Sequence, residues 1–233
     1  INIYEGSNQV IDGNEIAYSN WAGFYMSWEA GATKFSATQN LTVTNNYVHD
    51  NAGGGLWTDG DNVNTLYDGN RVENNTGAGI SHEVSYSCTI RNNTSRNNGQ
   101  GNSWLWGAQI QVQNSQGCEV YNNTVKAGPG GGHGIALFYQ NRGSGAYGPY
   151  DTSNNYVHDN DVTYSIPTNA AGAVADFNNG AFFGSMNNRW DYNHYHAANL
   201  NDLHWAWNDG WWTWSQFRSQ GIDVHGTADT NVN

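Results

Sequence analysis

The heptapeptide Asn-Asn-Tyr-Val-His-Asp-Asn occurs twice in this chain, at residues 45–51 and again at residues 154–160. Related phrases, in which Gly or Asn precedes an asparagine, place that asparagine at Asn14, Asn46, Asn70, Asn93, Asn123 and Asn155. Successive members of this set are 32, 24, 23, 30 and 32 residues apart. A period of this size is typical of a solenoid, whose repeats bury their apolar faces only against their neighbours. We therefore expect stacked coils with the asparagines in one ladder, each amide bonded to the next.

Counting from this ladder aligns the strands of neighbouring coils. Gly55-Leu56-Trp57-Thr58-Asp59 precedes Gly79-Ile80-Ser81-His82-Glu83 by 24 residues, and Gln109-Ile110-Gln111-Val112-Gln113 follows 30 residues later. Because side chains along a strand alternate between its two faces, we predict one inward and one outward set. The inward set is Leu56, Thr58, Ile80, His82, Ile110, Val112 and, in the next coil, Ile135. The outward set is Trp57, Asp59, Ser81, Glu83, Gln111 and Gln113, with Tyr25 joining it from the first coil.

The charge balance excludes several classes of partner. The chain has 8 Lys and Arg residues against 20 Asp and Glu residues, a net charge of −12. Such a surface repels nucleic acids and anionic membranes. No apolar run reaches the roughly 20 residues that a membrane-spanning helix needs. We expect a secreted monomer.

The two cysteines, Cys88 and Cys118, each lie five residues before a ladder asparagine. They should therefore occupy the same place in neighbouring coils, where strands are about 4.8 Å apart. A disulfide tolerates that Cα separation. A bridge and a buried pair of thiols are both compatible with the pattern.

Insertions and the last fifth of the chain depart from the repeat. Residues 100–106 carry Trp104 and Trp106, and such insertions usually build a binding wall on one side of a solenoid. After about residue 185 the repeat fades, so we divide the domain into coils over residues 1–185 and a Trp-rich capping segment over residues 186–233. Within it, Thr213 followed by Gln216 predicts a short capped helix across residues 214–219.

The recurrent Asn-Asn-x-Val turns, the Gly-Leu-Trp-Thr-Asp and Gly-Ile-Ser-His-Glu strands and the segment Gln-Phe-Arg-Ser-Gln-Gly-Ile-Asp at 216–223 carry a resemblance. The chain resembles the right-handed parallel β-helix proteins of the pectate-lyase-like superfamily. The resemblance implies an all-β, right-handed parallel β-helix of about six to seven coils, with a groove along stacked strands that holds a polysaccharide or oligosaccharide. That fold hosts lyases, hydrolases, epimerases and tailspikes. The Asp-Asp and Arg-Ile-Lys motifs of polygalacturonase-like hydrolases are absent from the chain.

The outward acids are the best candidates for chemistry. Asp59 and Glu83 fall in one column on adjacent coils, and Asp61 lies two residues beyond Asp59. Carboxyl groups about 5–5.5 Å apart suit retaining glycoside hydrolysis, and about 6.5–9.5 Å suits inversion. Asp59 with Glu83 matches the first, and Asp61 with Glu83 matches the second. His133, in a Gly-rich insertion, is a further candidate for acid–base catalysis.

Aromatic and amide side chains accompany these acids. Trp57 and Tyr25 offer faces on which a pyranose can stack, and Trp104 and Trp106 could extend the binding surface. Gln111 and Gln113 continue the outward columns as hydrogen-bonding groups for sugar hydroxyls.

Two other functions compete with hydrolysis. A polysaccharide lyase or uronan epimerase could use Ca²⁺ held by Asp59, Asp61 and Glu83, because Ca²⁺ prefers oxygen ligands. Elimination also needs a base, and no Lys or Arg falls in the acidic columns. We therefore rank hydrolysis, which requires no cofactor, ahead of elimination. A non-catalytic glycan-binding solenoid would use the tryptophans and leave the acids idle.

Overall fold

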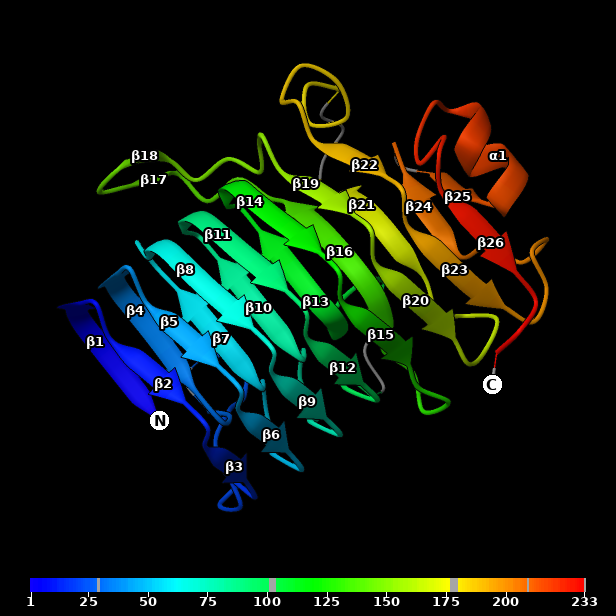
Figure 1. The fold of residues 1–233 in the computed structure, drawn as a ribbon. Coiled ribbons are helices and arrows are strands. Elements are labelled where there is room, and N and C mark those ends of the chain that lie inside the picture. Colours follow the sequence, from blue (N-terminus) through cyan, green and yellow to red (C-terminus); the bar gives the residue numbers. More distant parts are fainter. Residues whose placement is uncertain (29, 101–103, 177–179, 209, 233) are drawn as a thin grey trace.

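The computed structural model describes residues 1–28, 30–100, 104–176, 180–208 and 210–232. The chain winds into a parallel β-helix, with its N-terminus at one end of the stack and its C-terminus near the other (Figure 1). Each coil contributes strands to three faces. Among the described residues, no helix has the length and apolar character needed to cross a membrane.

The first and second faces belong to one 16-stranded sheet, because β4 (Lys34–Gln39) pairs with strands of both. β1 (Asn2–Ser7) pairs with β4 at the N-terminal end. The first face contains β7 (Leu56–Asp59), β10 (Ile80–Glu83), β13 (Ala108–Gln113), β16 (His133–Tyr139), β21 (Ala171–Ala175), β24 (Trp205–Trp207) and β25 (Gly210–Trp212). The second face contains β2 (Val10–Asp12), β5 (Thr42–Thr44), β8 (Val63–Asp68), β11 (Tyr86–Arg91), β14 (Gln116–Tyr121), β19 (Tyr156–His158) and β22 (Arg189–Asp191).

The third face is an eight-stranded parallel sheet. It contains β3 (Glu15–Ala17), β6 (Tyr47–His49), β9 (Arg71–Glu73), β12 (Thr94–Arg96), β15 (Thr124–Ala127), β20 (Asp161–Tyr164), β23 (His194–Ala197) and β26 (Thr227–Asp229). Since β22, β23 and β26 all follow residue 185, stacked strands continue into the capping segment.

Asparagine side chains line the corner between the second and third faces. Along this corner each Nδ2 donates to the Oδ1 of the asparagine in the next coil, at 2.9–3.0 Å. The ladder comprises Asn14, Asn46, Asn70, Asn93, Asn123, Asn160 and Asn193, and it ends on Asp223. The ladder satisfies backbone N–H groups as well, which stabilises each corner.

The prediction that Asn155 continues this ladder is wrong. Asn123 donates to Asn160 instead, at a separation of 37 residues. Asn155 lies at the corner between the first and second faces, where its Oδ1 accepts from the backbone N–H of Cys118 at 2.8 Å. An insertion between β16 and β19 lengthens this coil, so a count of 32 residues from Asn123 stops one corner early.

The two copies of the heptapeptide consequently lie on different faces. The first copy contains β6, in the third face, and the second contains β19, in the second face. In both copies the central valine, Val48 or Val157, is fully buried. The heptapeptide therefore encodes a short strand between two asparagine corners, and the length of the preceding chain decides which face it joins.

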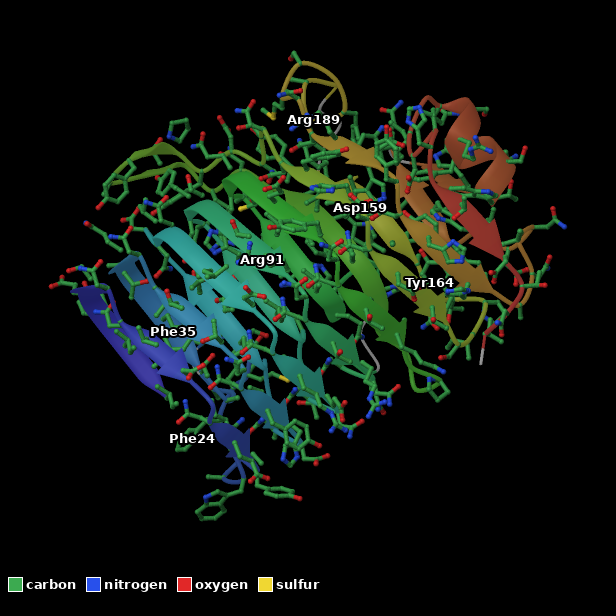
Figure 2. The ribbon with its side chains drawn as sticks, viewed as in Figure 1. Phe24, Phe35, Arg91, Asp159, Tyr164 and Arg189 are labelled. Atoms are coloured by element: carbon green, nitrogen blue, oxygen red, sulfur yellow. The ribbon has the colours of Figure 1, made fainter. Side chains whose placement is uncertain are left out.

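The predicted register of the first face is confirmed. Ile80 pairs with Leu56 and Ile110, and Ile110 pairs with Ile135; all four side chains are fully buried. His82 points inward with them, as predicted. Phe35 of β4, labelled in Figure 2, is fully buried as well. Apolar burial of this kind stabilises the folded chain by roughly 25 cal/mol per Å² of apolar surface removed from water.

The capped helix predicted across residues 214–219 is also confirmed. α1 (Trp214–Ser219) begins after Thr213, whose hydroxyl accepts from the backbone N–H of Gln216 while the Gln216 side chain accepts from Thr213. Phe217 is the buried residue of this helix, and its ring lies 6.4 Å from that of Trp205. The helix thereby packs against the C-terminal end of the stack (Figure 1).

Candidate functional site

A groove of about 440 Å³ lies over the outward side of β7, β10 and β13. Parallel pairing in register places Asp59 beside Glu83 and Glu83 beside Gln113, as predicted from the sequence. The lining of the groove includes Trp57, Ser81, Glu83, Trp106, Gln111 and Gln113, and Asp59 lies next to this lining as the strand partner of Glu83. Five of these six lining residues are sequence-predicted site residues, and the fold brings them to one surface.

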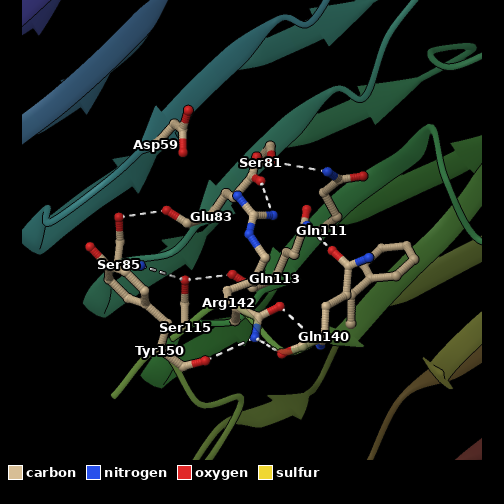
Figure 3. A network of polar contacts seen from close by, with 12 residues as sticks. Asp59, Ser81, Glu83, Ser85, Gln111, Gln113, Ser115, Gln140, Arg142 and Tyr150 are labelled. Carbon is tan, nitrogen blue, oxygen red and sulfur yellow. Dashed lines mark hydrogen bonds and ion pairs between the residues drawn. The ribbon is translucent and has the colours of Figure 1, made fainter. Parts of the chain in front are cut away.

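Glu83 is the more enclosed of the two paired acids. Its side chain is 14% exposed, against 22% for Asp59. Trp57 Nε1 donates to Glu83 Oε2 at 3.2 Å. Arg142 Nη1 donates to Glu83 Oε1 at 2.9 Å (Figure 3). Burial raises the pKa of the Glu83 carboxyl and the charge of Asp59 raises it further; Arg142 and Trp57 oppose this only in part, so the pKa stays above its ordinary value.

Asp59 has a cationic partner of its own. Lys34 Nζ lies 2.8 Å from Asp59 Oδ2, and the same ammonium group lies 4.2 Å from the ring centroid of Trp57. Lys34 is the first residue of β4 and reaches β7 from the neighbouring coil. The two acids are therefore held in different surroundings, one in an ion pair with a lysine and the other under an arginine and an indole.

Amide side chains continue the groove beyond the acids. Gln111 Nε2 donates to Ser81 Oγ at 3.0 Å, and Gln113 Nε2 donates to Gln140 Oε1 at 2.6 Å. Gln111 and Gln113 are 7% and 4% exposed, so they form the floor of the groove (Figure 3). Such a floor offers polar groups in fixed positions, which is the usual make-up of a small-molecule or glycan site.

Comparison with known proteins agrees with this architecture. The family described as "Right handed beta helix region" matches residues 1–162. The chain belongs to the right-handed β-helix family. No curated protein and no solved structure matches the chain. Membership of the right-handed β-helix family accounts for the stacked sheets and the corner ladders, whereas the chemistry of the groove depends on its own residues.

In this right-handed β-helix, the Asp61 carboxylate is bound by residues of an insertion. Its Oδ1 accepts a hydrogen bond from the Tyr150 hydroxyl at 2.8 Å and another from the backbone N–H of Ala146 at 2.9 Å. Both partners lie in the insertion that contains the hairpin of β17 (Ser144–Gly145) and β18 (Gly148–Pro149). Asp61 thus anchors the segment that begins at Arg142.

A Ca²⁺ site at Asp59, Asp61 and Glu83, as predicted, requires their carboxylates to converge, and the Asp61 carboxylate is already bound by the insertion. Among the described residues, the two groups of metal-ligand type whose ligand atoms converge lie elsewhere: His82, Cys88 and Cys118 in one, and His194, His196 and Asp229 in the other. The three predicted acids do not form such a group in the part of the chain that the structure describes.

His133 and Trp104 lie away from the acids. His133 is 6% exposed in β16, beside Ala108 of β13. It lines a second cavity, of about 430 Å³, together with Trp104 and Trp211. The structure therefore does not bring His133 to Glu83. Trp106, by contrast, lines the acidic groove and stacks on Phe138 with 4.1 Å between ring centroids. Residues 101–103 of this insertion lie outside the described residues.

Tyr25 belongs to an aromatic loop at the edge of the groove. The loop follows β3, and five of its side chains are largely exposed: Tyr18, Trp21, Phe24, Tyr25 and Trp28 are 69–90% exposed. Figure 2 shows Phe24 projecting from this end of the molecule. Met26 and Ser27 of the same loop line the groove. Of these five residues only Tyr25 was predicted as a site residue; the high density of aromatic residues over 18–28 was the sequence signal for the others.

Arg142 and Lys34 are the functional residues that sequence analysis missed. It found no Lys or Arg in the acidic columns, which is correct for the strands themselves. Arg142 arrives from an insertion and Lys34 from the adjacent coil. In the sequence, the one sign of this contact was the position of Arg142 at the start of the Gly- and Tyr-rich insertion over residues 142–150.

Proposed function

We propose that the groove binds a glycan chain and that Glu83 and Asp59 hydrolyse a glycosidic bond within it. One observation carries the proposal: burial raises the pKa of Glu83 while Asp59, its direct neighbour in the adjacent strand, forms an ion pair with Lys34. Two carboxyl groups in unlike surroundings are the usual basis for dividing the roles of acid and base.

In this proposal Glu83 is the general acid. Its raised pKa keeps a proton available for the leaving glycosidic oxygen at a pH where an ordinary glutamate has lost it. Asp59 supplies the carboxylate that attacks or stabilises the anomeric carbon. Residues paired across parallel strands have Cα atoms about 4.8 Å apart, which favours the short carboxyl separation of a retaining enzyme.

The remaining groove residues would hold the sugar. Trp106 is backed by Phe138 and offers an aromatic surface inside the groove, and Gln111 and Gln113 present amides to hydroxyl groups. Trp57 is 8% exposed, donates to Glu83 and lies under Lys34, so we assign it mainly to positioning the acid. The aromatic loop with Tyr25 would cover the chain from one side, because exposed aromatic groups favour contact with sugar rings.

A specific observation favours a second candidate function. Arg142 and Lys34 place two cationic groups on the acidic face, 2.9 and 2.8 Å from Glu83 and Asp59 respectively. A uronate carboxylate could pair with Arg142, and Lys34, once it has lost its own proton, could take the α-proton while the glycosidic C–O bond breaks, as a lyase requires. Hydrolysis remains first because the raised pKa of Glu83 serves an acid, whereas elimination would leave that feature without a role.

The products distinguish the functions. The chain is incubated with a panel of neutral and uronic polysaccharides, with and without a chelator, and reducing ends and ultraviolet absorbance are followed together. Hydrolysis creates reducing ends without an absorbing product, whereas elimination creates an unsaturated, absorbing uronate. Retardation in an affinity gel without either product would instead identify a glycan-binding protein and overturn the proposed catalysis.

A further inference from the structure

Three side chains with soft ligand atoms meet inside the β-helix. His82 comes from β10, Cys88 from β11 and Cys118 from β14, and they are 0%, 4% and 2% exposed. Cys88 and Cys118 pair directly across their strands, as predicted, and both are free thiols. One ligand atom from each of the three residues lies within 4.8 Å of the others. This group, the His–Cys cluster, lies on the interior side of the strand that carries Glu83.

Hydrogen bonds fix the His82 ring so that one nitrogen faces the thiols. The Thr58 hydroxyl donates to the Ser81 carbonyl at 3.2 Å and accepts from the Tyr67 hydroxyl at 3.1 Å. Since its single proton is used, Thr58 Oγ1 accepts from His82 Nδ1, which is 2.7 Å away. This assignment leaves a lone pair on Nε2. Metal-binding histidines are typically held in this way through the nitrogen that does not bind the metal.

Polar atoms in the His–Cys cluster lack ordinary partners. Among the described residues, His82 Nε2 and Thr65 Oγ1 are buried atoms with no hydrogen-bond partner. Thr65 pairs with Cys88 across β8 and β11, so its side chain lies in the same inward column. A buried polar atom without a partner costs about 1–3 kcal/mol. Two such atoms beside two thiols indicate that the interior is arranged around a further group.

We propose that His82, Cys88 and Cys118 bind a Zn²⁺ ion in the interior of the β-helix, with Thr65 beside the fourth coordination position. Bond lengths of about 2.0–2.3 Å place the ligand atoms of tetrahedral zinc about 3.3–3.8 Å apart, so small side-chain rotations complete the site. Two thiolates and a neutral imidazole carry a charge of −2, which Zn²⁺ neutralises. A monovalent soft ion such as Cu⁺ would leave net charge in an apolar interior, which is costly. The proposal does not depend on the function of the groove.

The direct test measures metal in the whole chain. Because the interior is closed, the ion must enter during folding. The chain is unfolded in denaturant with reductant and chelator, then refolded with equimolar Zn²⁺, with equimolar Cu⁺ or without metal. We expect refolding with zinc to give equimolar bound zinc that survives desalting. Refolding with Co²⁺ should give the thiolate-to-metal absorption band of a tetrahedral site.

Three results would overturn the proposal. The first is a folded chain that holds less than about a tenth of an equivalent of zinc and shows two reactive thiols when it is unfolded. This result would identify a simple pair of thiols. Loss of two hydrogens in the mass of the purified chain, with no reactive thiol, would identify a Cys88–Cys118 disulfide. Preferential retention of Cu⁺ would identify a different metal site. None of these measurements requires a variant to fold.

Variants then assign the ligands. Cys118→Ser should abolish zinc retention, and Thr89→Ser, which changes the outward neighbour of Cys88, should leave it unchanged. Thr58→Val removes the group that orients His82, so zinc affinity measured by chelator competition should fall about 10- to 100-fold. Unchanged affinity in Thr58→Val would remove Thr58 from the site, and unchanged zinc retention in Cys118→Ser would overturn the site itself.

Discussion

Glu83 and His82 are neighbours in β10, yet the alternation of the strand sends Glu83 into the groove and His82 into the interior of the β-helix. On the groove side, carboxyl groups are paired with flexible cations that arrive from other segments. On the interior side, the His82 ring is held by the Thr58 hydroxyl of the adjacent strand and lies near two thiols. One short strand thus presents two separate sets of side chains, because period-two alternation isolates its two surfaces. Variants that change one surface and not the other test this separation.

The largest effect is expected on the groove side. Glu83→Gln removes the proposed acid, so turnover of the glycan found by the polysaccharide screen should fall about 10²- to 10⁴-fold. Zinc retention should not change, because His82 keeps its contacts. Glu119→Gln, which alters an exposed carboxylate on the second face, is the matched control and should keep full activity. Full activity in Glu83→Gln would remove Glu83 from the mechanism.

A smaller effect is expected on the interior side. If the His–Cys cluster binds zinc, free zinc at 100 times the dissociation constant should stabilise the chain by about 2.7 kcal/mol in denaturant unfolding. The Glu83→Gln variant should show the same zinc-dependent gain, whereas Cys118→Ser should show none. An equal gain in Cys118→Ser would place the zinc outside the cluster.

Asn98 lies at the corner before β13, and its loss should destabilise the stack that carries both surfaces. Asn98 Nδ2 donates to the Val72 carbonyl and to Gln109 Oε1, and its Oδ1 accepts from Asn75. Asn98→Ala should reduce the free energy of unfolding by about 1–3 kcal/mol for each buried partner left unsatisfied. Asn201→Ala, in an exposed turn, is the control and should change it by less than about 0.5 kcal/mol. Chemical denaturation measures both.

The smallest effect concerns the pH dependence of the groove. Arg142 lowers the pKa of Glu83, against burial and the charge of Asp59. Arg142→Gln removes that influence, so the pKa of Glu83 should rise further. A general acid works while protonated, and the alkaline limb of the pH–rate profile should therefore move to higher pH. A limb that moves to lower pH, or an unchanged profile, would show that Arg142 does not act on the catalytic acid.

Several parts of the site could be predicted because they follow from register alone. Asp59 beside Glu83 and Cys88 beside Cys118 each required only a count from the asparagine ladder and the spacing of parallel strands. The inward direction of His82 followed from alternation in the same way. Each of these pairs lies within coils of 23, 24 or 30 residues, where no long insertion disturbs the count.

The count failed where an insertion intervened. Asn155 occupies a different corner from Asn123 because the chain between β16 and β19 is longer than in the other coils. The same insertion carries Arg142 to Glu83, a contact between residues 59 positions apart. Insertions have no repeat to constrain them, so their endpoints depend on contacts such as that between Asp61 and Tyr150.

The amino-acid pattern alone was enough to predict a stack of strands with asparagine corners, the inward and outward sets of the first face, and the capped helix at its end. These features follow from local periodicity and hydrogen bonding, which short segments encode. Only the tertiary structure decided which face each copy of Asn-Asn-Tyr-Val-His-Asp-Asn joins, which cations reach Asp59 and Glu83, and that His82 meets two thiols. Those outcomes depend on how three faces close around one interior, and closure is set by the summed lengths of coils and insertions rather than by any single segment.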